Sequence, residues 1–339
     1  MKTLVCTAPG QLDYREGDMP QLQKGYSLLK IRCIGVCGTD LHAYEGTQPY
    51  FDYPRILGHE LSAEFVGGDA PGFVPGEAVT FVPYFHCGHC IACRSGKPNC
   101  CVNLQVCGVH RHGGMVEYLL VPSYALVHGE GLSFEELALV EPLAIGAHSI
   151  QRAGVQRGEY VLVIGAGPIG LGIMEFARIQ GAQVIAMDIN ERRLSFCRDH
   201  LRIPYTIHAK SETVHQQLKE ITQGDMPTVV MDATGNREAI NKGFEYMAHG
   251  GCYVMVGLQK GEIRFLHPEF HKREGTLMSS RNATRQDFNR VIQSLKQGLV
   301  NPATYITHTV LFEKAKEAFP QWLDPGYGTI KAMIRMQES

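Results

Sequence analysis

A glycine-rich turn between a buried strand and a helix is the feature that most constrains the fold of this chain. Residues 160–164 are continuously apolar, which is typical of a strand buried on both faces of a parallel sheet. The turn follows at 165–170, a helical pattern runs over 169–179, and residues 183–187 form the next apolar segment. Together they make a βαβ unit of about thirty residues. The sequence therefore predicts an α/β domain with a doubly wound parallel sheet.

The turn has the spacing Gly-x-Gly-x-x-Gly, which is typical of dinucleotide-binding sites. Its first glycine permits a tight turn, its second lets the backbone approach a pyrophosphate, and its third lets helix and strand pack closely. The predicted cofactor-binding residues of this unit are Gly165, Gly167, Pro168, Ile169, Gly170, Asp188 and Arg193. The alternative is a structural glycine turn, with Asp188 as a helix N-cap.

Asp188 indicates which dinucleotide binds. It lies 18 residues beyond Gly170, where a carboxylate can accept a hydrogen bond from a ribose 2′-hydroxyl. The same carboxylate would repel a 2′-phosphate, so we expect NAD rather than NADP. Arg192 and Arg193 argue mildly in the other direction.

Two further residues are expected near the nicotinamide half of the cofactor. Gly257 and Arg281 follow apolar segments, and ligands of doubly wound folds lie outside the carboxyl ends of the strands. The alternative for both residues is ordinary loop chemistry.

A cluster of four cysteines predicts a structural zinc site. The ligands are Cys87, Cys90, Cys93 and Cys101. Zinc takes four tetrahedral ligands, and a closed four-thiolate site on a loop is structural rather than catalytic. Loop residues surround these cysteines, which fits poorly with buried, inert thiols. Cys100 could substitute for Cys101.

Composition limits the other possibilities. A chain of 339 residues suggests two domains, and 32 basic against 34 acidic residues give no global field for nucleic acid or anionic lipid. We therefore expect no nucleic-acid partner and no membrane partner. The longest apolar run, 160–174, is too short to span a bilayer. No signal-peptide stretch opens the chain, so clustered cysteines favour metal binding in a reducing, cytoplasmic setting.

The first 130 residues have a different character from the βαβ unit. Short β-type segments at 27–34, 77–82 and 115–121 are bounded by glycine or proline and predict a β-rich domain. From Ser133 the pattern becomes helical up to Ile150. The C-terminal stretch predicts a helix over 285–297 and a strand over 330–336.

Several short motifs occur in an order that resembles a known enzyme family. They are Cys37-Gly-Thr-Asp-x-His42, Gly58-His59-Glu60, the four-cysteine loop, Glu141-Pro142 and the glycine-rich turn. Together, over nearly the whole chain, they resemble the zinc-dependent medium-chain dehydrogenases. The resemblance implies a GroES-like β-rich catalytic domain at 1–150 with both zinc sites. It also implies a Rossmann NAD-binding domain at 151–285 and a return to the catalytic domain at 286–339.

The resemblance implies a second, catalytic zinc held by Cys37 and His59. The third ligand is cysteine in the alcohol dehydrogenase branch, and glutamate in the sorbitol and threonine dehydrogenase branches. Glu141 places this chain on the glutamate side, and Glu60 is a reserve carboxylate that can exchange in or stay outside. The alternative for Glu141 is a solvent-facing helix residue, although the apolar residues after it favour burial.

The activity implied is hydride transfer between a secondary hydroxyl and NAD, with Thr39 and His42 carrying the proton outward. The glutamate at 141 and a group of cationic residues favour a polyol or a sugar acid such as galactonate as substrate: the loop 109–114 with His110, Arg111 and His112, then Arg281, and His271 or Lys272. For any one of these cations, the alternative is a solvated surface charge. L-threonine or a simple secondary alcohol is the alternative within the family, where homodimers and homotetramers are usual. A non-catalytic dinucleotide-binding protein is an alternative of another class. A nucleic-acid-binding zinc protein is disfavoured by the cysteine spacing.

Overall fold

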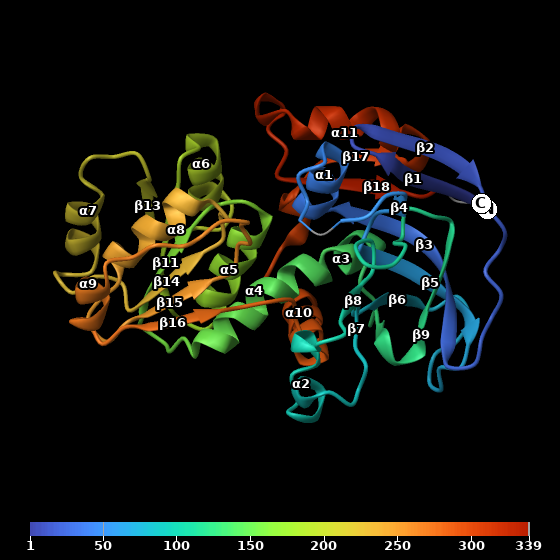
Figure 1. Ribbon diagram of the computed structural model, residues 1–339, viewed down its shortest axis with the longest axis horizontal. Helices are drawn as coiled ribbons and strands as arrows, with labels where there is room; N and C mark the ends of the chain where they lie inside the picture. Colours follow the sequence, from blue (N-terminus) through green and yellow to red (C-terminus); the bar gives the residue numbers. More distant parts are fainter. Residues whose placement is uncertain (50, 338–339) are drawn as a thin grey trace. The chain divides into compact units, whose positions relative to one another are not determined.

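The computed structural model describes residues 1–49 and 51–337, and the chain divides into two compact units (Figure 1). The first unit holds residues 1–141 and 283–339, and the second holds residues 142–282. The first boundary falls nine residues before the predicted one (141 against 150) and the second falls three residues before it (282 against 285). Both the observed and the predicted position of the first boundary lie inside helix α4 (Val140–Ala153), which continues from one unit into the other.

The first unit consists mainly of short strands. Its largest sheet has seven strands in the order β10-β6-β5-β3-β18-β17, with β9 paired to β3, and β2-β1-β4 and β7-β8 form smaller sheets. The strands are β1 (Lys2–Ala8), β2 (Gln11–Glu16), β3 (Tyr26–Val36), β4 (Arg55–Ile56), β5 (Glu60–Gly68), β6 (Ala78–Phe81), β7 (Tyr84–Phe85), β8 (Gln105–Val106), β9 (Tyr118–Pro122), β10 (Leu126–His128), β17 (Ile306–Leu311) and β18 (Lys331–Arg335). The helices are α1 (Gly38–Glu45), α2 (Ile91–Arg94), α3 (Phe134–Ala138), α10 (Arg285–Lys296) and α11 (Ala315–Leu323).

The C-terminal return completes the largest sheet of the first unit. Strand β18 pairs antiparallel with β3, so that Ala332 lies opposite Val36. Ile31 of β3 and Phe81 of β6 share an apolar core with Phe319 of α11. This pairing brings the beginning of β18 to the end of β3, where the candidate metal site begins.

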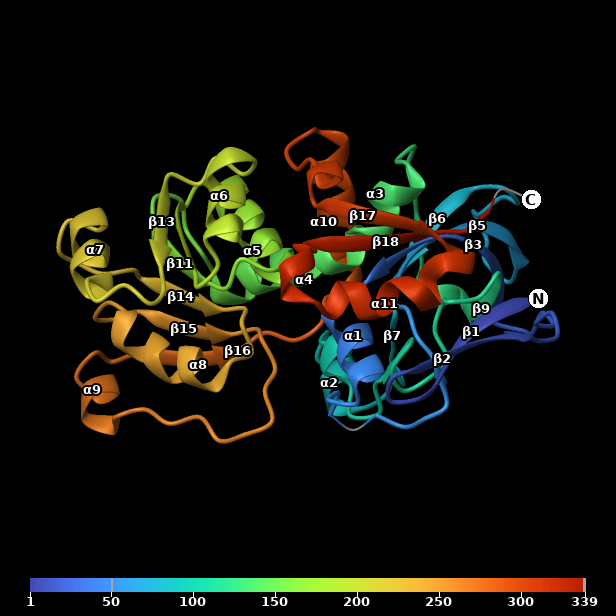
Figure 2. The ribbon, with the colours of Figure 1, turned by 90° about the horizontal axis from the view of Figure 1, so that it is seen from above.

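The second unit is a six-stranded parallel sheet in the order β13-β12-β11-β14-β15-β16. Helices α5 and α6 lie on one side of this sheet and α8 lies on the other (Figure 2). The strands are β11 (Tyr160–Ile164), β12 (Gln183–Asp188), β13 (Tyr205–His208), β14 (Val229–Asp232), β15 (Cys252–Met255) and β16 (Thr276–Ser279). The helices are α5 (Pro168–Ile179), α6 (Glu191–Asp199), α7 (Val214–Ile221), α8 (Arg237–Gly243) and α9 (His267–His271). The chain switches direction across the sheet beside β11, whose carboxyl end carries the glycine-rich turn.

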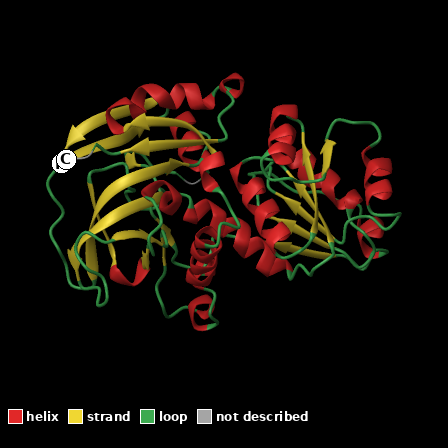
Figure 3. Cartoon of the chain, turned by 180° about the vertical axis from the view of Figure 1, so that it is seen from behind, coloured by secondary structure: helices red, strands yellow, loops and turns green. Residues whose placement is uncertain are grey.

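The predicted helix after Ser133 is interrupted. Ser133 caps α3 and forms a capping box with Glu136, as its sequence indicates. That helix ends at Ala138, and α4 begins at Val140, so one predicted helix is two (Figure 3). Among the described residues, no helix has both the length and the apolar character needed to cross a membrane.

Candidate metal and cofactor sites

Three potential metal ligands meet where β3 ends and β5 begins. Cys37 follows β3 and is the N-cap of α1, while His59 and Glu60 stand at the start of β5. Gly35 of β3 pairs with Glu60 of β5, and this pairing brings the three potential ligands together. One ligand atom from each of Cys37, His59 and Glu60 lies within 4.8 Å of the other two.

Asp40 ties this group to the backbone. Its Oδ2 accepts a hydrogen bond from the N–H of Cys37 (2.9 Å), and its Oδ1 accepts one from the N–H of Gly58 (3.0 Å). The same Oδ1 is 3.8 Å from Nδ1 of His59. Sequence reasoning passed over Asp40, although an acid in the third position of a helix that starts after Cys37 is a capping signal.

The surroundings of His59 fit a bound cation. Its ring is buried, and among the described residues its Nδ1 has no hydrogen-bond partner. Burial alone would lower the pKa of His59, but the charges of Cys37, Asp40 and Glu141 outweigh it and raise that pKa well above its ordinary value. A thiolate, an imidazole and carboxylates facing one buried space are the donor set that zinc takes in catalytic sites.

Glu60 is paired with a lysine from the far end of the chain. Nζ of Lys331 donates to both carboxylate oxygens of Glu60 at 2.7 Å, and also to the carbonyl oxygen of Val36 at 3.2 Å. Lys331 is 2% exposed and Glu60 is fully buried. A Cβ at position 35 would lie 2.2 Å from Oε2 of Glu60, so Gly35 leaves the room for this ion pair. Sequence analysis missed Lys331, because no local pattern signals its partner.

Glu141 is buried and has a different partner. It lies in the first turn of α4, is 5% exposed, and accepts a short hydrogen bond from the hydroxyl of Tyr84 on its Oε1. Burial raises the pKa of Glu141 to about 7, against the charge of His59. Glu141 therefore faces the same space as His59, not solvent. The group of mutually close ligand atoms includes Glu60 rather than Glu141.

The predicted proton-relay residues lie on α1. Thr39 and His42 are three positions apart, so they share one face of the helix. Thr39 is half-buried two positions after Cys37, and the side chain of His42 is 61% exposed. Nδ1 of His42 is 2.9 Å from the hydroxyl of Thr47.

The four-cysteine loop forms a second, separate group. The sulfurs of Cys87, Cys90, Cys93 and Cys101 all lie within 4.8 Å of one another. Cys101 is buried, whereas Cys100 is exposed and lies outside the group. Four converging thiols on a loop fit a closed zinc site, and Cys101 rather than Cys100 completes it.

The glycine-rich turn of the second unit has the shape that a dinucleotide needs. Gly165 has a φ of +101°, and a Cβ at Gly170 would lie 1.8 Å from the carbonyl oxygen of Gly165, so neither position tolerates a side chain. Gly167 is different, because a Cβ there would meet only Nη1 of Arg193, at 3.9 Å. The space beside Gly167, at the start of α5, is open to a pyrophosphate, with Pro168 and Ile169 in the first turn of the helix.

Asp188 holds the same turn from the end of β12. Its Oδ2 accepts a hydrogen bond from the N–H of Ala166 (2.6 Å), and its Oδ1 accepts one from the N–H of Asn190 (2.8 Å). Nη1 of Arg193 is 4.0 Å from its Oδ2. The N-cap of α6 is Asn190, so the alternative interpretation of Asp188 as that cap is wrong.

Gly257 faces a loop that Asp232 organises. Oδ1 of the fully buried Asp232 accepts hydrogen bonds from the N–H groups of Thr234 and Gly235, both at 3.1 Å, and burial raises its pKa to about 6. A Cβ at Gly257 would lie 2.2 Å from the nitrogen of Gly235. Arg281 follows β16 and is exposed.

The cationic residues predicted near the substrate differ in their surroundings. Nδ1 of His110 and Nδ1 of His112 accept backbone N–H groups, from Val106 (3.0 Å) and Ile56 (3.2 Å), so both rings support the loop. The guanidinium of Arg111 lies over the ring of Phe85, 5.5 Å from its centre. Lys272 is paired with Glu269 on the surface of α9, next to the exposed His271.

Two family models match the chain. The alcohol dehydrogenase GroES-like domain covers residues 23–130, and the zinc-binding dehydrogenase model covers residues 168–297. An L-galactonate-5-dehydrogenase from Escherichia coli K12 is 40% identical over 336 residues, which is 98% of each chain. The chain belongs to the zinc-binding dehydrogenase family.

Other members of the family are similar over almost the full length. A sorbitol dehydrogenase from Halalkalibacterium halodurans is 30% identical, with 94% of this chain and 95% of that one covered. A solved structure described as a short chain alcohol dehydrogenase from E. coli CFT073, complexed with NADH, has a TM-score of 0.91 at 29% identity and covers 99% of both chains. The predicted fold class and the predicted zinc-dependent, nicotinamide-dependent oxidoreductase are confirmed.

Metal content tests the two zinc sites separately. We expect two zinc ions per chain in the wild-type protein, and one in each of Cys37→Ser and Cys93→Ser, measured by mass spectrometry after purification without chelators. Cys37→Ser should abolish turnover and keep the melting temperature, while Cys93→Ser should lower it by several degrees, because a structural zinc contributes folding energy. One zinc ion or none in the wild-type protein would contradict the assignment.

Cofactor choice tests Asp188. We expect Asp188→Ser to lower the ratio of kcat/KM for NAD to that for NADP by about tenfold, equivalent to about 1.4 kcal/mol of repulsion of the 2′-phosphate. Glu191→Ser is the control, because it removes an equal charge from the exposed start of α6 and should leave the ratio unchanged. Equal kcat/KM for both cofactors in the wild-type enzyme would refute the role of Asp188.

Proposed function

We propose that this protein is an NAD-dependent zinc dehydrogenase that oxidises a secondary hydroxyl of a polyol or a sugar acid. The observation that carries the proposal is the buried cluster of Cys37, His59 and two carboxylates in the first unit. The second unit carries the glycine-rich turn. The relatives named for L-galactonate and sorbitol support the substrate class. The alternative function within the family is that of an L-threonine or simple secondary-alcohol dehydrogenase.

Charge balance supports Glu141 rather than Glu60 as the third ligand. The two oxygens of Glu60 already accept hydrogen bonds from the ammonium group of Lys331, which neutralises its charge. The thiolate of Cys37 and the carboxylate of Glu141 then match the two positive charges of a zinc ion. Buried charges need such local pairing, because each unpaired ion carries a large desolvation penalty. His59 completes a set of three protein ligands, which leaves the fourth position for substrate.

The chain's own residues then orient the reactants and move a proton. Zinc supplies Lewis-acid polarisation of the substrate hydroxyl and the nicotinamide accepts a hydride, which is the chemistry that these two groups contribute when bound. Asp40 fixes the turn at Cys37 and places a carboxylate oxygen 3.8 Å from Nδ1 of His59. The hydroxyl of Thr39 receives the proton, and the exposed imidazole of His42, which can both accept and donate a proton, passes it to solvent.

The binding roles in the second unit follow from its turn. Gly165, Gly167 and Gly170 shape the pyrophosphate site, and Pro168 and Ile169 begin the helix that faces the phosphates. Asp188 takes the adenosine ribose, and its negative charge selects NAD. We assign Gly257 and Arg281 to the nicotinamide half.

For a sugar acid, we propose Arg111 as the group that pairs with the carboxylate. Its half-buried guanidinium stacks on Phe85, and among the described residues no carboxylate is paired with it. Arginine recognises carboxylates through two parallel hydrogen bonds. Arg281 is the second candidate.

We further propose that the enzyme is a cytoplasmic homodimer or homotetramer. All eleven cysteines are free, which suits a reducing compartment.

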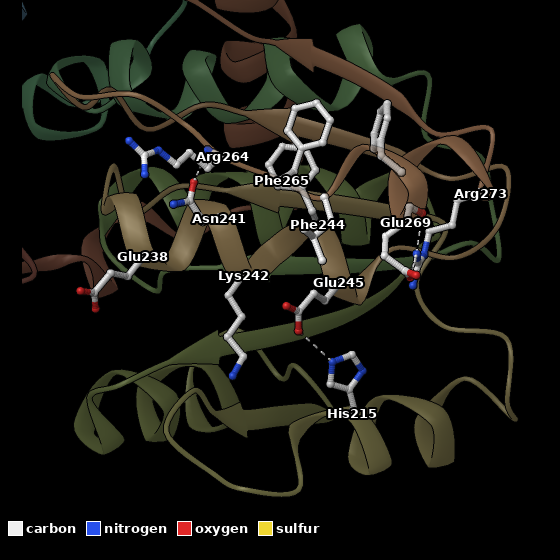
Figure 4. A pocket seen from close by; sticks show the side chains of 12 residues that line it. His215, Glu238, Asn241, Lys242, Phe244, Glu245, Arg264, Phe265, Glu269 and Arg273 are labelled. Atoms are coloured by element: carbon white, nitrogen blue, oxygen red, sulfur yellow. Dashed lines mark hydrogen bonds and ion pairs between the residues drawn. The ribbon is translucent and has the colours of Figure 1, made fainter.

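Strand β16 is an edge strand whose residues are largely exposed, and exposed edges favour pairing with a second chain. In the same unit, Phe244 and Phe265 stand in a cavity of about 750 Å³ with charged side chains around them (Figure 4). Sedimentation velocity tests this directly, and a monomer at micromolar concentration would contradict it.

A substrate panel tests the proposed function. We expect kcat/KM with NAD to be higher for galactonate-type acids or sorbitol than for threonine or 2-butanol, followed by the absorbance of reduced nicotinamide. A preference for 2-butanol would reject the substrate class, and a preference for threonine would move the enzyme to the amino-alcohol branch. No turnover of any alcohol would favour a non-catalytic protein.

If an acid is the best substrate, Arg111→Ala should raise its KM by about tenfold or more, because a charged hydrogen-bonded pair contributes about 1.5–3 kcal/mol. The KM for a neutral polyol should change little. Lys314→Ala is the matched control, since it removes a cation from the exposed surface of the first unit, and it should change neither value. A larger effect of Arg281→Ala would assign the carboxylate to Arg281.

A further inference from the structure

The two buried carboxylates of the metal site have partners of opposite kinds. Glu60 has both oxygens hydrogen-bonded to the cationic Nζ of Lys331. Glu141 has one oxygen, Oε1, hydrogen-bonded to the neutral hydroxyl of Tyr84. A cationic partner cancels the charge of the carboxylate that it binds, whereas a phenol orients a carboxylate and leaves its charge in place. Among the described residues, Glu141 is therefore the one of these two carboxylates that no lysine or arginine neutralises.

Tyr84 is held in place by its strand and its packing. It belongs to β7, pairs with Val106 of β8, and is 4% exposed. Its ring lines a small cavity of about 60 Å³ together with Asn99, Tyr124 and Arg285. Among the described residues its hydroxyl has no hydrogen-bond partner other than Glu141. The phenol thus has a fixed position and one contact, with a predicted metal ligand.

We propose that Tyr84 is the positioning residue of the catalytic metal site: its hydroxyl holds Oε1 of Glu141 and so fixes the rotamer in which this carboxylate would bind zinc. The inference rests on the proposed function, in which Glu141 is the third ligand. It adds a residue that none of the sequence motifs contains. Tyr84 acts through Glu141, and it does not touch the reacting atoms.

The physical reason for this role is that Tyr84 and Glu141 are both buried away from water. With both side chains buried, water does not easily replace the phenol when it is removed. Glu141 would then lose the contact that fixes its rotamer, and the metal would lose a preorganised ligand. Hydrogen-bond partners of metal ligands commonly change metal affinity or activity by about 10–100-fold when they are removed.

The test measures zinc release from the full-length, zinc-loaded enzyme into a chromophoric chelator. The catalytic ion is identified as the release phase that Cys37→Ser lacks. We expect Tyr84→Phe to accelerate this phase about tenfold or more, and to leave the phase of the four-cysteine site unchanged. Tyr253→Phe is the matched control, because Tyr253 is also buried and donates its hydroxyl hydrogen bond to the carbonyl of Ile240 (2.9 Å) in the second unit.

Double variants that combine Tyr84→Phe with a substitution of either glutamate show whether Tyr84 acts through Glu141. In Glu141→Ala, adding Tyr84→Phe should not change zinc release further, whereas in Glu60→Gln it should have its full effect. In the cobalt-substituted enzyme, Tyr84→Phe should shift the visible d–d absorption bands, which report ligand geometry. Tyr84→Gln and Tyr84→Leu repeat the comparison, with and without an N–H donor, if the phenylalanine variant folds poorly.

The outcomes separate this inference from the proposed function. A wild-type enzyme without the Cys37-dependent release phase would overturn the metal site itself. A wild-type enzyme with that phase, and the same rate in Tyr84→Phe, would overturn the role of Tyr84 alone. Equal acceleration by Tyr84→Phe in the presence and absence of Glu141 would also overturn it, since the effect would then be merely structural.

Discussion

The buried ion pair between Glu60 and Lys331 is the interaction on which the first unit's site depends. Four ionisable side chains that can carry negative charge (Cys37, Asp40, Glu60 and Glu141) face one buried region around His59. Removing such charges from water carries a penalty of several kcal/mol per ion unless each is paired. Lysine at 331 neutralises one carboxylate permanently, while Asp40 is held by two backbone N–H groups. What remains is a deficit of positive charge that a divalent cation can fill.

This requirement explains the path of the chain. The ammonium group must reach the end of β3, and the return of the C-terminal segment as β18, paired to β3, delivers it there. Burial would lower the pKa of Lys331, but the charge of Glu60 more than compensates and raises it, so the lysine stays charged. The second unit also buries two carboxylates, and their hydrogen-bond donors include backbone N–H groups, which are neutral. There Asp188 and Asp232 are buried at the carboxyl ends of parallel strands, and both accept hydrogen bonds from backbone N–H groups of the loops that follow these ends or face them, where the dinucleotide is proposed to bind.

Sequence reasoning succeeded where the chemistry is local. The glycine-rich turn, with its flanking strand and helix, is contiguous, and the four cysteines lie within one loop, so spacing alone indicated both sites. The burial of Glu141 was visible in the apolar residues after it. The ion pair of Glu60 was not predictable in this way, because 271 residues separate it from Lys331 and only the pairing of β18 with β3 joins them. Tyr84 was missed because a tyrosine in a two-residue strand has no pattern of its own. Asn190 took the capping role considered for Asp188, since the helix starts later than the end of β12.

The central claim is that Lys331 keeps Glu60 in an ion pair, so that Glu141 rather than Glu60 is the third ligand of the metal. Crystallography of the zinc-loaded enzyme, with anomalous diffraction recorded at the zinc edge, tests it most directly. The account predicts zinc at about 2.0–2.3 Å from the sulfur of Cys37, an imidazole nitrogen of His59 and one oxygen of Glu141. It also predicts that Glu60 remains hydrogen-bonded to Lys331. A structure in which Glu60 is the ligand, Lys331 has lost its carboxylate partner and Glu141 stays away from the metal would contradict it.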